Sequence, residues 1–218
     1  MDKRAKKATV AAEVELNKMA EKQTAKTPRT ERGRRTMRAI LDAAAIEFGA
    51  NGFGETSIVS ITQRAKVALG SFYTYFDSKE EVFRALVKDM SARVGEHAAT
   101  AMTGDETALE RESVAFTAFL RFAREHKEIY RIIDEAEFAD PESHQAHYEG
   151  AASRIFDRLM EGANTGELND GLTEAHAWAI MGMNVFLGLR YSVWTEDKSV
   201  EDIASVANQI LTAGIVRR

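Results

Sequence analysis

The chain has 218 residues, of which 44% are apolar, so it can bury one sizeable core or divide into two domains. It contains no cysteine, which excludes disulfides, thiolate catalysis and Cys-ligated zinc. The net charge of -5 is unevenly distributed, because residues 1–90 carry +5 and residues 91–218 carry -10. A basic N-terminal part on an acidic body is typical of a protein that faces nucleic acid.

Helix is the expected secondary structure throughout the chain. Only two prolines are present, long stretches are rich in good helix formers, and no run of Val, Ile and Thr alternates at period two. We therefore predict an all-α fold. No segment has the apolar length of a signal-peptide core or of a membrane span, so we expect a cytoplasmic protein.

The N-terminal region begins with a basic segment and one amphipathic helix. Residues 1–30 lack aromatic residues and are expected to form a mobile arm, either a solvated tail or a segment that follows DNA phosphates. Apolar residues at helical spacing predict a helix from Arg34 to Phe48. The helix is expected to end in a turn at Gly49, Gly52 and Gly54.

Two short helices are predicted next. Thr56 stands at the N-cap position of the first, before an apolar face at Ile58, Ile61 and Ala65. After a tight break at Lys66, a third helix is predicted over residues 68–76. A fourth helix then begins with the capping box Ser78 and Glu81.

The third of these helices has the composition that DNA reading requires. Phe72 and Phe76 are four residues apart and can share a buried face, which leaves small and polar neighbours exposed. One helix fits the major groove of DNA, where its exposed side chains reach base edges while flanking groups bind phosphates. The alternative is an aromatic-rich core helix in an ordinary bundle.

Residues 34–90 resemble the TetR family of bacterial regulators. The matching residues are Ile40, Leu41, Ala43, Ala44, Phe48, Gly52, Phe53, Thr56, Ser57, Ile58, Ile61, Ala65, Val67, Gly70, Phe72, Tyr73, Tyr75, Phe76, Ser78, Lys79 and Glu80. The resemblance implies a helix-turn-helix DNA-binding domain over residues 31–78. It implies a helical domain over residues 79–218 that binds a small-molecule effector and forms a homodimer through its last two helices. The expected function is a transcriptional repressor that effector releases from double-stranded operator DNA.

The same resemblance implies which side chains contact DNA. Thr56 would cap the second helix beside a phosphate, and Tyr73 and Lys79 would bind the backbone. Leu69, Ser71 and Tyr75 would face bases. The full predicted set is Thr56, Ser57, Lys66, Leu69, Gly70, Ser71, Tyr73, Thr74, Tyr75 and Lys79. Two departures affect the turn before the third helix: Lys66 stands where the family often has Gly, and Ala68 where it often has a Ser or Thr cap.

The second half of the chain supplies candidate pocket residues. Residues 177–189 are apolar around most of a helical circumference, which is typical of a helix buried on two sides. Aromatic and Met side chains suit an adaptable apolar cavity, although each could equally fill a dry core. Arg190 follows this run and could pair either with a ligand anion or with an acidic residue. The predicted ligand residues are Phe119, Phe122, Phe156, Met160, Trp178, Met181, Phe186 and Arg190.

These features favour an elongated apolar effector with an acidic head, such as a fatty acid or an acyl-CoA. No cofactor, metal site or catalytic residue is expected, because no histidine has Glu three positions before it, as a carboxylate-bridged metal pair in a helical bundle would require. Two rival readings are an enzyme with dispersed catalytic residues and a helical adaptor that binds other proteins. Steep salt dependence and preference for an operator over random duplex distinguish a DNA binder from an adaptor.

Overall fold

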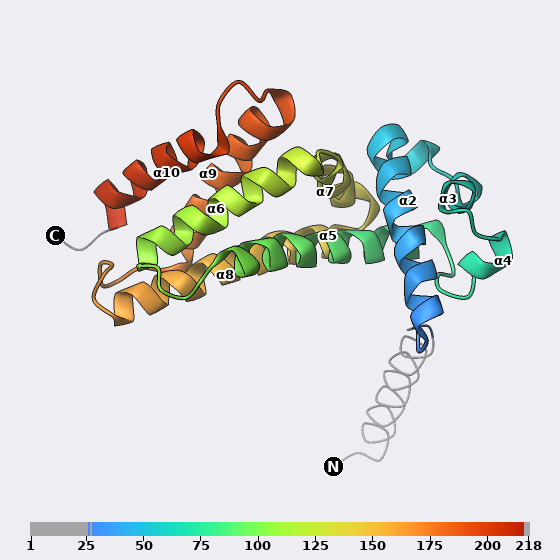
Figure 1. Ribbon diagram of the computed structural model, residues 1–218, viewed down its shortest axis with the longest axis horizontal. Coiled ribbons are helices and arrows are strands. Elements are labelled where there is room, and N and C mark those ends of the chain that lie inside the picture. The colour runs from blue at the N-terminus through green and yellow to red at the C-terminus, as the bar shows by residue number, and fades with distance from the viewer. Residues whose placement is uncertain (1–25, 27, 216–218) are drawn as a thin grey trace, which may run out of the picture. The chain divides into compact units, whose positions relative to one another are not determined.

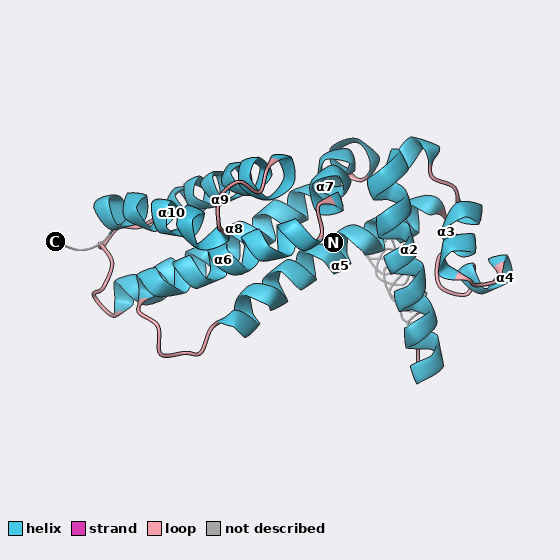
Figure 2. Cartoon of the chain, turned by 45° about the horizontal axis from the view of Figure 1, so that its top comes forward, coloured by secondary structure: helices cyan, strands magenta, loops and turns pink. Residues whose placement is uncertain are grey.

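The computed structural model describes residue 26 and residues 28–215, and every regular element within them is helical (Figure 2). This confirms the predicted all-α fold. None of the described helices combines the length and the apolarity that a membrane crossing requires. The elements are α2 (Glu31–Glu55), α3 (Ile58–Ala65), α4 (Leu69–Phe72), α5 (Lys79–Ala101), α6 (Ala108–Glu125), α7 (Glu128–Ala139), α8 (Pro141–Asn164), α9 (Glu174–Gly188), the π-helical segment η1 (Leu189–Trp194) and α10 (Val200–Ile215).

The chain divides into two compact units. Unit 1 comprises the described residues up to Ala44 and Ser57–Val82, and unit 2 comprises Ala45–Thr56 and the residues from Phe83 onward. Helices α2 and α5 each contribute residues to both units, since the divisions fall inside them. The domain limits set from the sequence stay predictions. The arm expected over residues 1–30 lies almost entirely outside the described residues.

Unit 1 is built around a small apolar core. Its fully buried side chains come from every helix of the unit, and they include Ile40, Ile61, Phe72 and Val82. Half of the predicted capping box at the start of α5 is formed, because the Ser78 hydroxyl accepts a hydrogen bond from the Glu81 backbone N–H at 3.1 Å, while the Glu81 carboxylate accepts from the Asp77 N–H. These contacts fix the short helices α3 and α4, which could not persist alone at four to eight residues.

Unit 2 is a helical bundle in which α6 packs against α10 and α8 packs against α9 (Figure 1). One core cluster joins α8, α9 and α10 and contains Ile155, Leu159 and Ile180, while a second contains Phe116, Leu120 and Ile203. The π-helical segment η1 is tied to α6, because the buried Ser192 hydroxyl donates to the Leu120 carbonyl at 3.1 Å.

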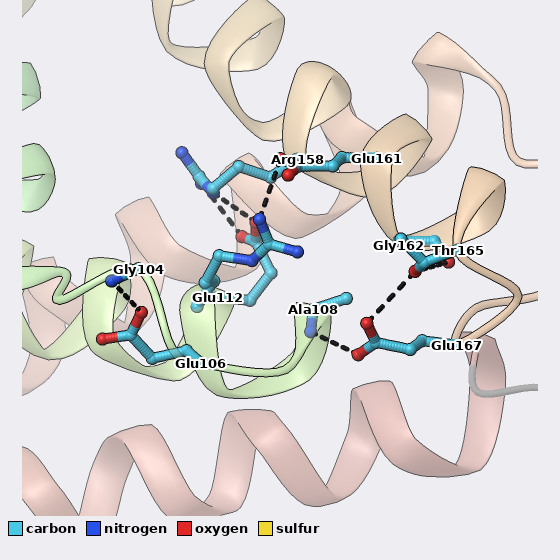
Figure 3. A network of polar contacts seen from close by, with 10 residues as sticks. Gly104, Glu106, Ala108, Glu112, Arg158, Glu161, Gly162, Thr165 and Glu167 are labelled. Carbon is cyan, nitrogen blue, oxygen red and sulfur yellow. Dashed lines mark hydrogen bonds and ion pairs between the residues drawn. The ribbon is translucent and has the colours of Figure 1, made fainter.

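A buried ion pair crosses this bundle between α6 and α8 (Figure 3). Arg158 donates two hydrogen bonds to Glu112, with its Nε 2.5 Å from Oε1 and its Nη2 3.0 Å from Oε2. The Glu112 side chain is 3% exposed and the Arg158 side chain 17%. Breaking such a pair leaves one charge buried without its partner, which costs far more than losing an exposed pair.

Replacing Glu112 by Ala should therefore lower the free energy of unfolding by about 3–5 kcal/mol. Urea unfolding at fixed protein concentration, followed by circular dichroism, measures this change. The matched control is Glu201→Ala, which breaks the exposed Arg121–Glu201 pair and should leave the free energy of unfolding close to that of the wild type. Equal losses in the two variants would contradict a structural role for the buried pair.

Candidate functional site

The third helix is shorter than the sequence predicts. Helix α4 covers only Leu69–Phe72, and the chain continues through a turn to Phe76 rather than as helix. The predicted burial of Phe72 and Phe76 is confirmed, and their ring centroids lie 5.6 Å apart. The two buried rings attach this segment to the core of unit 1, which leaves residues 69–71 and 73–75 to contact a ligand.

The turn before α4 has the strained geometry that its residues imply. Lys66 adopts a left-handed conformation with φ 55° and ψ 40°, and its N–H donates to the Gln63 carbonyl at 3.2 Å. A non-glycine residue in this region costs about 1–2 kcal/mol. Ala68 occupies the N-cap of α4 and supplies no side-chain hydrogen bond. Both departures from the family pattern thus fall on the turn that orients α4.

The predicted DNA-contact residues differ in exposure. Ser57, Lys66, Leu69, Gly70, Tyr73 and Thr74 are exposed, and Ser71, Tyr75 and Lys79 are partly buried. Tyr73 is 49% exposed, whereas the Tyr75 hydroxyl lies near the backbone at Gly33. Six of the ten residues thus present side chains or backbone directly to solvent.

Thr56 is not the N-cap of α3, which corrects the prediction. Its side chain is buried, and its hydroxyl donates to the backbone carbonyls of Gly52 at 2.7 Å and Glu47 at 3.1 Å. Ser57 is the N-cap and forms a capping box with Ser60, with N-to-Oγ distances of 3.0 and 3.2 Å. A buried hydroxyl with two internal acceptors is not available to a phosphate.

Further basic and polar side chains lie exposed in unit 1 that the prediction omitted. Arg32 and Arg35 are exposed in the first turns of α2, and Gln63 is exposed on α3. Arg34 between them is paired with Glu31 at 2.7 Å. The run of arginines was visible in the sequence, and arginine is one of the residues that supply the phosphate contacts of protein–DNA interfaces.

Unit 2 contains an apolar pocket between α5, α6, α8 and α9. The space between its lining residues measures about 640 Å³, including the part that is open to solvent. Of the eight predicted ligand residues, Phe119 and Met181 line it. The other lining residues are Val94, Gly95, Ala98, Ala115, Phe116, His147, Tyr148, Ala151, Arg154, Ile155, Arg158, Asn184 and Val185.

Three of the predicted ligand residues belong to the core or its edge. Phe122 is fully buried and packs against the rings of His97 and His126, so it does not reach the pocket. Phe156 and Met160 are partly buried on α8, and Phe156 packs against the cluster formed with α9 and α10. Neither of them lines the pocket.

The other three predicted ligand residues face solvent. Trp178 and Phe186 are 39% and 71% exposed, because α9 turns these side chains away from the pocket. Arg190 lies in η1, exposed, with its Nη1 3.9 Å from Asp197 and hydrogen-bonded to Thr195. The sequence left open whether Arg190 pairs with a ligand or with an acidic residue, and the structure shows the acidic residue.

The pocket instead contains polar groups from α8 that the prediction missed. Arg154, Arg158 and His147 all line it, and His147 Nδ1 lies 2.6 Å from the Ser91 hydroxyl. Burial, followed by the nearby charges of Arg154 and His144, lowers the pKa of His147 to about 4. The imidazole is therefore neutral at physiological pH.

The depressed pKa makes His147 a source of acid instability. The unfolded chain, with an ordinary pKa near 6.5, binds more protons than the folded chain as the pH falls from that value towards about 4. Between about pH 7.5 and about pH 5, His147 should therefore remove about 2 kcal/mol from the free energy of unfolding. Urea unfolding at both pH values should show this loss in the wild type and a correspondingly smaller one in His147→Gln. The same loss in both proteins would refute the assignment.

The described residues contain no group of three or more His, Asp or Glu side chains arranged to hold a metal ion.

A family model described as bacterial regulatory proteins of the tetR family matches residues 40–86. That range covers most of unit 1 and includes α3, α4 and the turn between them.

Three curated proteins are similar to parts of this chain. The HTH-type transcriptional regulator YdgC of Bacillus subtilis is 30% identical over 118 residues, which are 52% of this chain and 59% of YdgC. The A-factor receptor protein of Streptomyces griseus is 39% identical over 59 residues, 27% of this chain and 21% of that protein. The chain thus spans less than two thirds of these two relatives. The fatty acid metabolism regulator protein of B. subtilis is 24% identical over 178 residues, 79% of this chain and 90% of that protein.

Solved structures share the fold over most of the chain. The fatty acid degradation regulator FadR from Bacillus halodurans superposes with a TM-score of 0.74 at 18% identity, covering 86% of this chain and 98% of that one. FadR from B. subtilis in complex with stearoyl-CoA gives 0.71 at 19% identity, covering 81% and 98%. Residues 40–86 thus match the tetR family of bacterial regulatory proteins, and most of the chain shares the fold of the two FadR structures.

Proposed function

We propose that the protein is a repressor that binds a two-half-site operator as a homodimer and is released by an acyl-type effector bound in unit 2. The observation that carries the DNA-binding part is the surface of α4 and the turn after it. Leu69, Tyr73 and Thr74 are exposed there, in the same segment as the buried Phe72 and Phe76. Helix α4 is too short to be stable alone, and the buried rings of Phe72 and Phe76 hold it in place so that these side chains stay exposed.

The exposed residues suggest a division of roles at the DNA. Tyr73 and Lys79 would bind phosphates, since a hydroxyl and an ammonium carry no preference for a base. Leu69 and Ser71 lie in the first turn of α4, the part of a recognition helix that reaches base edges. Tyr75 is partly buried against α2 and is better placed to support the surface than to read a base.

The dimer is expected to form through α9 and α10. These helices expose Trp178, Phe186, Val206 and Ile210, with 39–71% of each side chain accessible. Exposed apolar residues gathered on two helices mark an interaction surface. A Cβ at Gly182 or Gly214 would meet nothing within 4 Å in the isolated chain, which leaves room for a partner helix to approach closely.

Helix α7 offers a physical link between effector and DNA. One of its faces, with Ile129, Tyr130 and Ile133, lines a second cavity of about 310 Å³ that shares Phe119, His147, Tyr148 and Val185 with the main pocket. Its other face holds the end of α2. Arg131 Nη1 donates to the carbonyls of Gly49 at 3.1 Å and Ala50 at 2.8 Å, and Glu135 accepts a hydrogen bond from the Phe53 N–H.

The link is effective because α2 is continuous up to these contacts. Its one non-helical residue is Gly52, with φ 81° and ψ 170°, and the N-terminal half of the same helix belongs to unit 1. An effector that moves α7 therefore moves the end of α2. A ligand that favours a dimer with the wrong spacing for successive major grooves must lower DNA affinity reciprocally.

The chemistry of the effector is inferred from the pocket and from relatives. The pocket lining is mainly apolar, which suits a hydrocarbon chain. One relative is a fatty acid metabolism regulator, and one structural neighbour was solved with stearoyl-CoA. A fatty acid or an acyl-CoA is the class of ligand that both observations support.

The DNA contacts can be tested by fluorescence anisotropy with the upstream DNA of the protein's own coding sequence. Tyr73→Ala should weaken binding up to about tenfold on every duplex, because it removes a hydrogen bond to a phosphate. Ser71→Ala should instead change the preference at one base step, measured with single-base variants of the operator. Ser153→Ala, an exposed serine on α8, is the control. Unchanged binding in both α4 variants would overturn the proposed docking.

The α7 link can be tested by removing its clamp on α2. Arg131→Ala should leave effector binding in the absence of DNA close to that of the wild type, since Arg131 lines neither cavity. It should lower the coupling factor, which is the ratio of effector Kd values in operator-bound and free protein. Arg121→Ala, which removes an exposed pair on α6, should leave that ratio unchanged. A wild-type ratio in the Arg131 variant would exclude this route.

A further inference from the structure

The main pocket contains an arginine with no protein partner. Arg154 lies on α8 and lines the pocket, and it forms no hydrogen bond or ion pair within residues 28–215. Its side chain is partly buried, and burial is the main cause that lowers its pKa, with the charge of Arg158 second. A charge that is partly withdrawn from water gains more from an oppositely charged partner than a fully exposed charge does.

The guanidinium of Arg154 lies beside two glycines, Gly95 and Gly150, and not beside an acidic side chain of the described residues. A Cβ at Gly95 on α5 would lie 3.3 Å from both Arg154 Cζ and Nε, and a Cβ at Gly150 would lie 3.5 Å from Nη1. The guanidinium therefore lies directly against the backbone of α5. A Cβ at position 95 would require the guanidinium to shift by a few tenths of an ångström.

The charged residues that line the main pocket do not balance Arg154, and the acidic residue Asp134 lines the adjoining cavity instead. Arg158 is neutralised by its two hydrogen bonds to Glu112, and His147 is neutral at physiological pH. None of the described residues that line the pocket is acidic. The pocket thus carries one net positive charge at the wall formed by α5 and α8, beside apolar residues on α6 and α9.

A ligand with the opposite charge satisfies this arrangement. A carboxylate or a phosphate can accept two parallel hydrogen bonds from a guanidinium, and such charge-assisted pairs are stronger than neutral ones. The gain is larger here than at the surface, because Arg154 is already partly withdrawn from water. Asn184 on α9 also lines the pocket and has no hydrogen bond of its side chain within the described residues, so it offers a second polar contact.

We propose that Arg154 binds the anionic head of an amphiphilic effector, a carboxylate or a phosphate, while the apolar tail of the effector lies against Phe116, Phe119, Met181 and Val185. This inference rests on the proposed function, since it names the chemistry of the ligand in the same pocket. It assigns the head-group role to Arg154 in place of Arg190, whose guanidinium is exposed and faces Asp197.

The test compares ligands that share one tail and differ only in the head. Isothermal titration with the full-length wild-type protein should show dodecanoate binding at least about tenfold more tightly than dodecan-1-ol, since only the acid can form the ionic pair. Lengthening the acid should tighten binding by up to about fourfold per buried methylene. Equal affinity of the acid and the alcohol would overturn the proposal.

Variants of Arg154 and Arg190 then show which arginine binds the anionic head. Arg154→Met should weaken dodecanoate at least about tenfold while leaving dodecan-1-ol unchanged, and Arg154→Lys should fall between the wild type and Arg154→Met because it keeps the charge and loses the fork. Arg190→Ala is the matched control and should bind dodecanoate like the wild type. Equal losses for the acid and the alcohol in Arg154→Met, or no loss for the acid, would contradict the assignment. A thermal melt of each variant shows whether it is folded.

Dodecanoyl-CoA identifies the source of the anion. Loss of dodecanoyl-CoA binding together with that of dodecanoate in Arg154→Met shows that Arg154 also accepts a phosphate, whereas loss of dodecanoate binding alone assigns the site to a carboxylate. Operator binding without ligand is measured in parallel and should be unchanged in Arg154→Met. Absence of operator binding in the wild type would refute the proposed function, whereas the ligand comparison stands on its own.

Discussion

The attachment of α7 to the end of α2 is the contact on which the account of regulation depends. The last carbonyls of a helix have no partner within it and must be satisfied from outside. Here Arg131 donates hydrogen bonds to the carbonyls of Gly49 and Ala50, and the buried Thr56 hydroxyl donates to those of Glu47 and Gly52. A side chain at position 52 would meet Glu135 and Arg131 within 2.8 Å, so glycine is required there for space as well as for its positive φ.

The two ends of this arrangement differ in their physical chemistry. In unit 1 an exposed surface of hydroxyls and basic side chains lies over two buried rings, which suits a polyanion that is bound from solvent. In unit 2 an apolar pocket with a single unbalanced cation suits a small amphiphile that is withdrawn from solvent. The charge distribution along the chain, +5 before residue 90 and -10 after it, follows the same division.

Local signals in the sequence predicted local structure well. The four-residue spacing of Phe72 and Phe76 predicted their burial, and the pair Ser78 and Glu81 predicted the start of α5. Both predictions depend on contacts within about one helical turn. The cap of α3 was misplaced by one residue, since Thr56 and Ser57 are both good capping residues. The hydrogen bonds of the Thr56 hydroxyl to the last turns of α2 decide between them.

The pocket could not be predicted in the same way, because four helices far apart in sequence form it. Helix α9 is apolar around most of its circumference, so its sequence does not show that Met181 faces the pocket while Trp178 and Phe186 face solvent. Arg190 drew attention by following an apolar run, yet η1 turns it outward. Arg154 gave no signal, because an arginine among charged neighbours on α8 is indistinguishable from a surface residue until α5 is placed against it.

The central claim is that one ligand, bound in unit 2, lowers the affinity of unit 1 for a specific operator. Its most direct test is fluorescence anisotropy with the upstream operator region and with random duplex at several salt concentrations, each with and without a saturating fatty acid or acyl-CoA. The account predicts salt-sensitive binding that prefers the operator and weakens when ligand is added. Specific operator binding that is indifferent to every ligand in the series would contradict it.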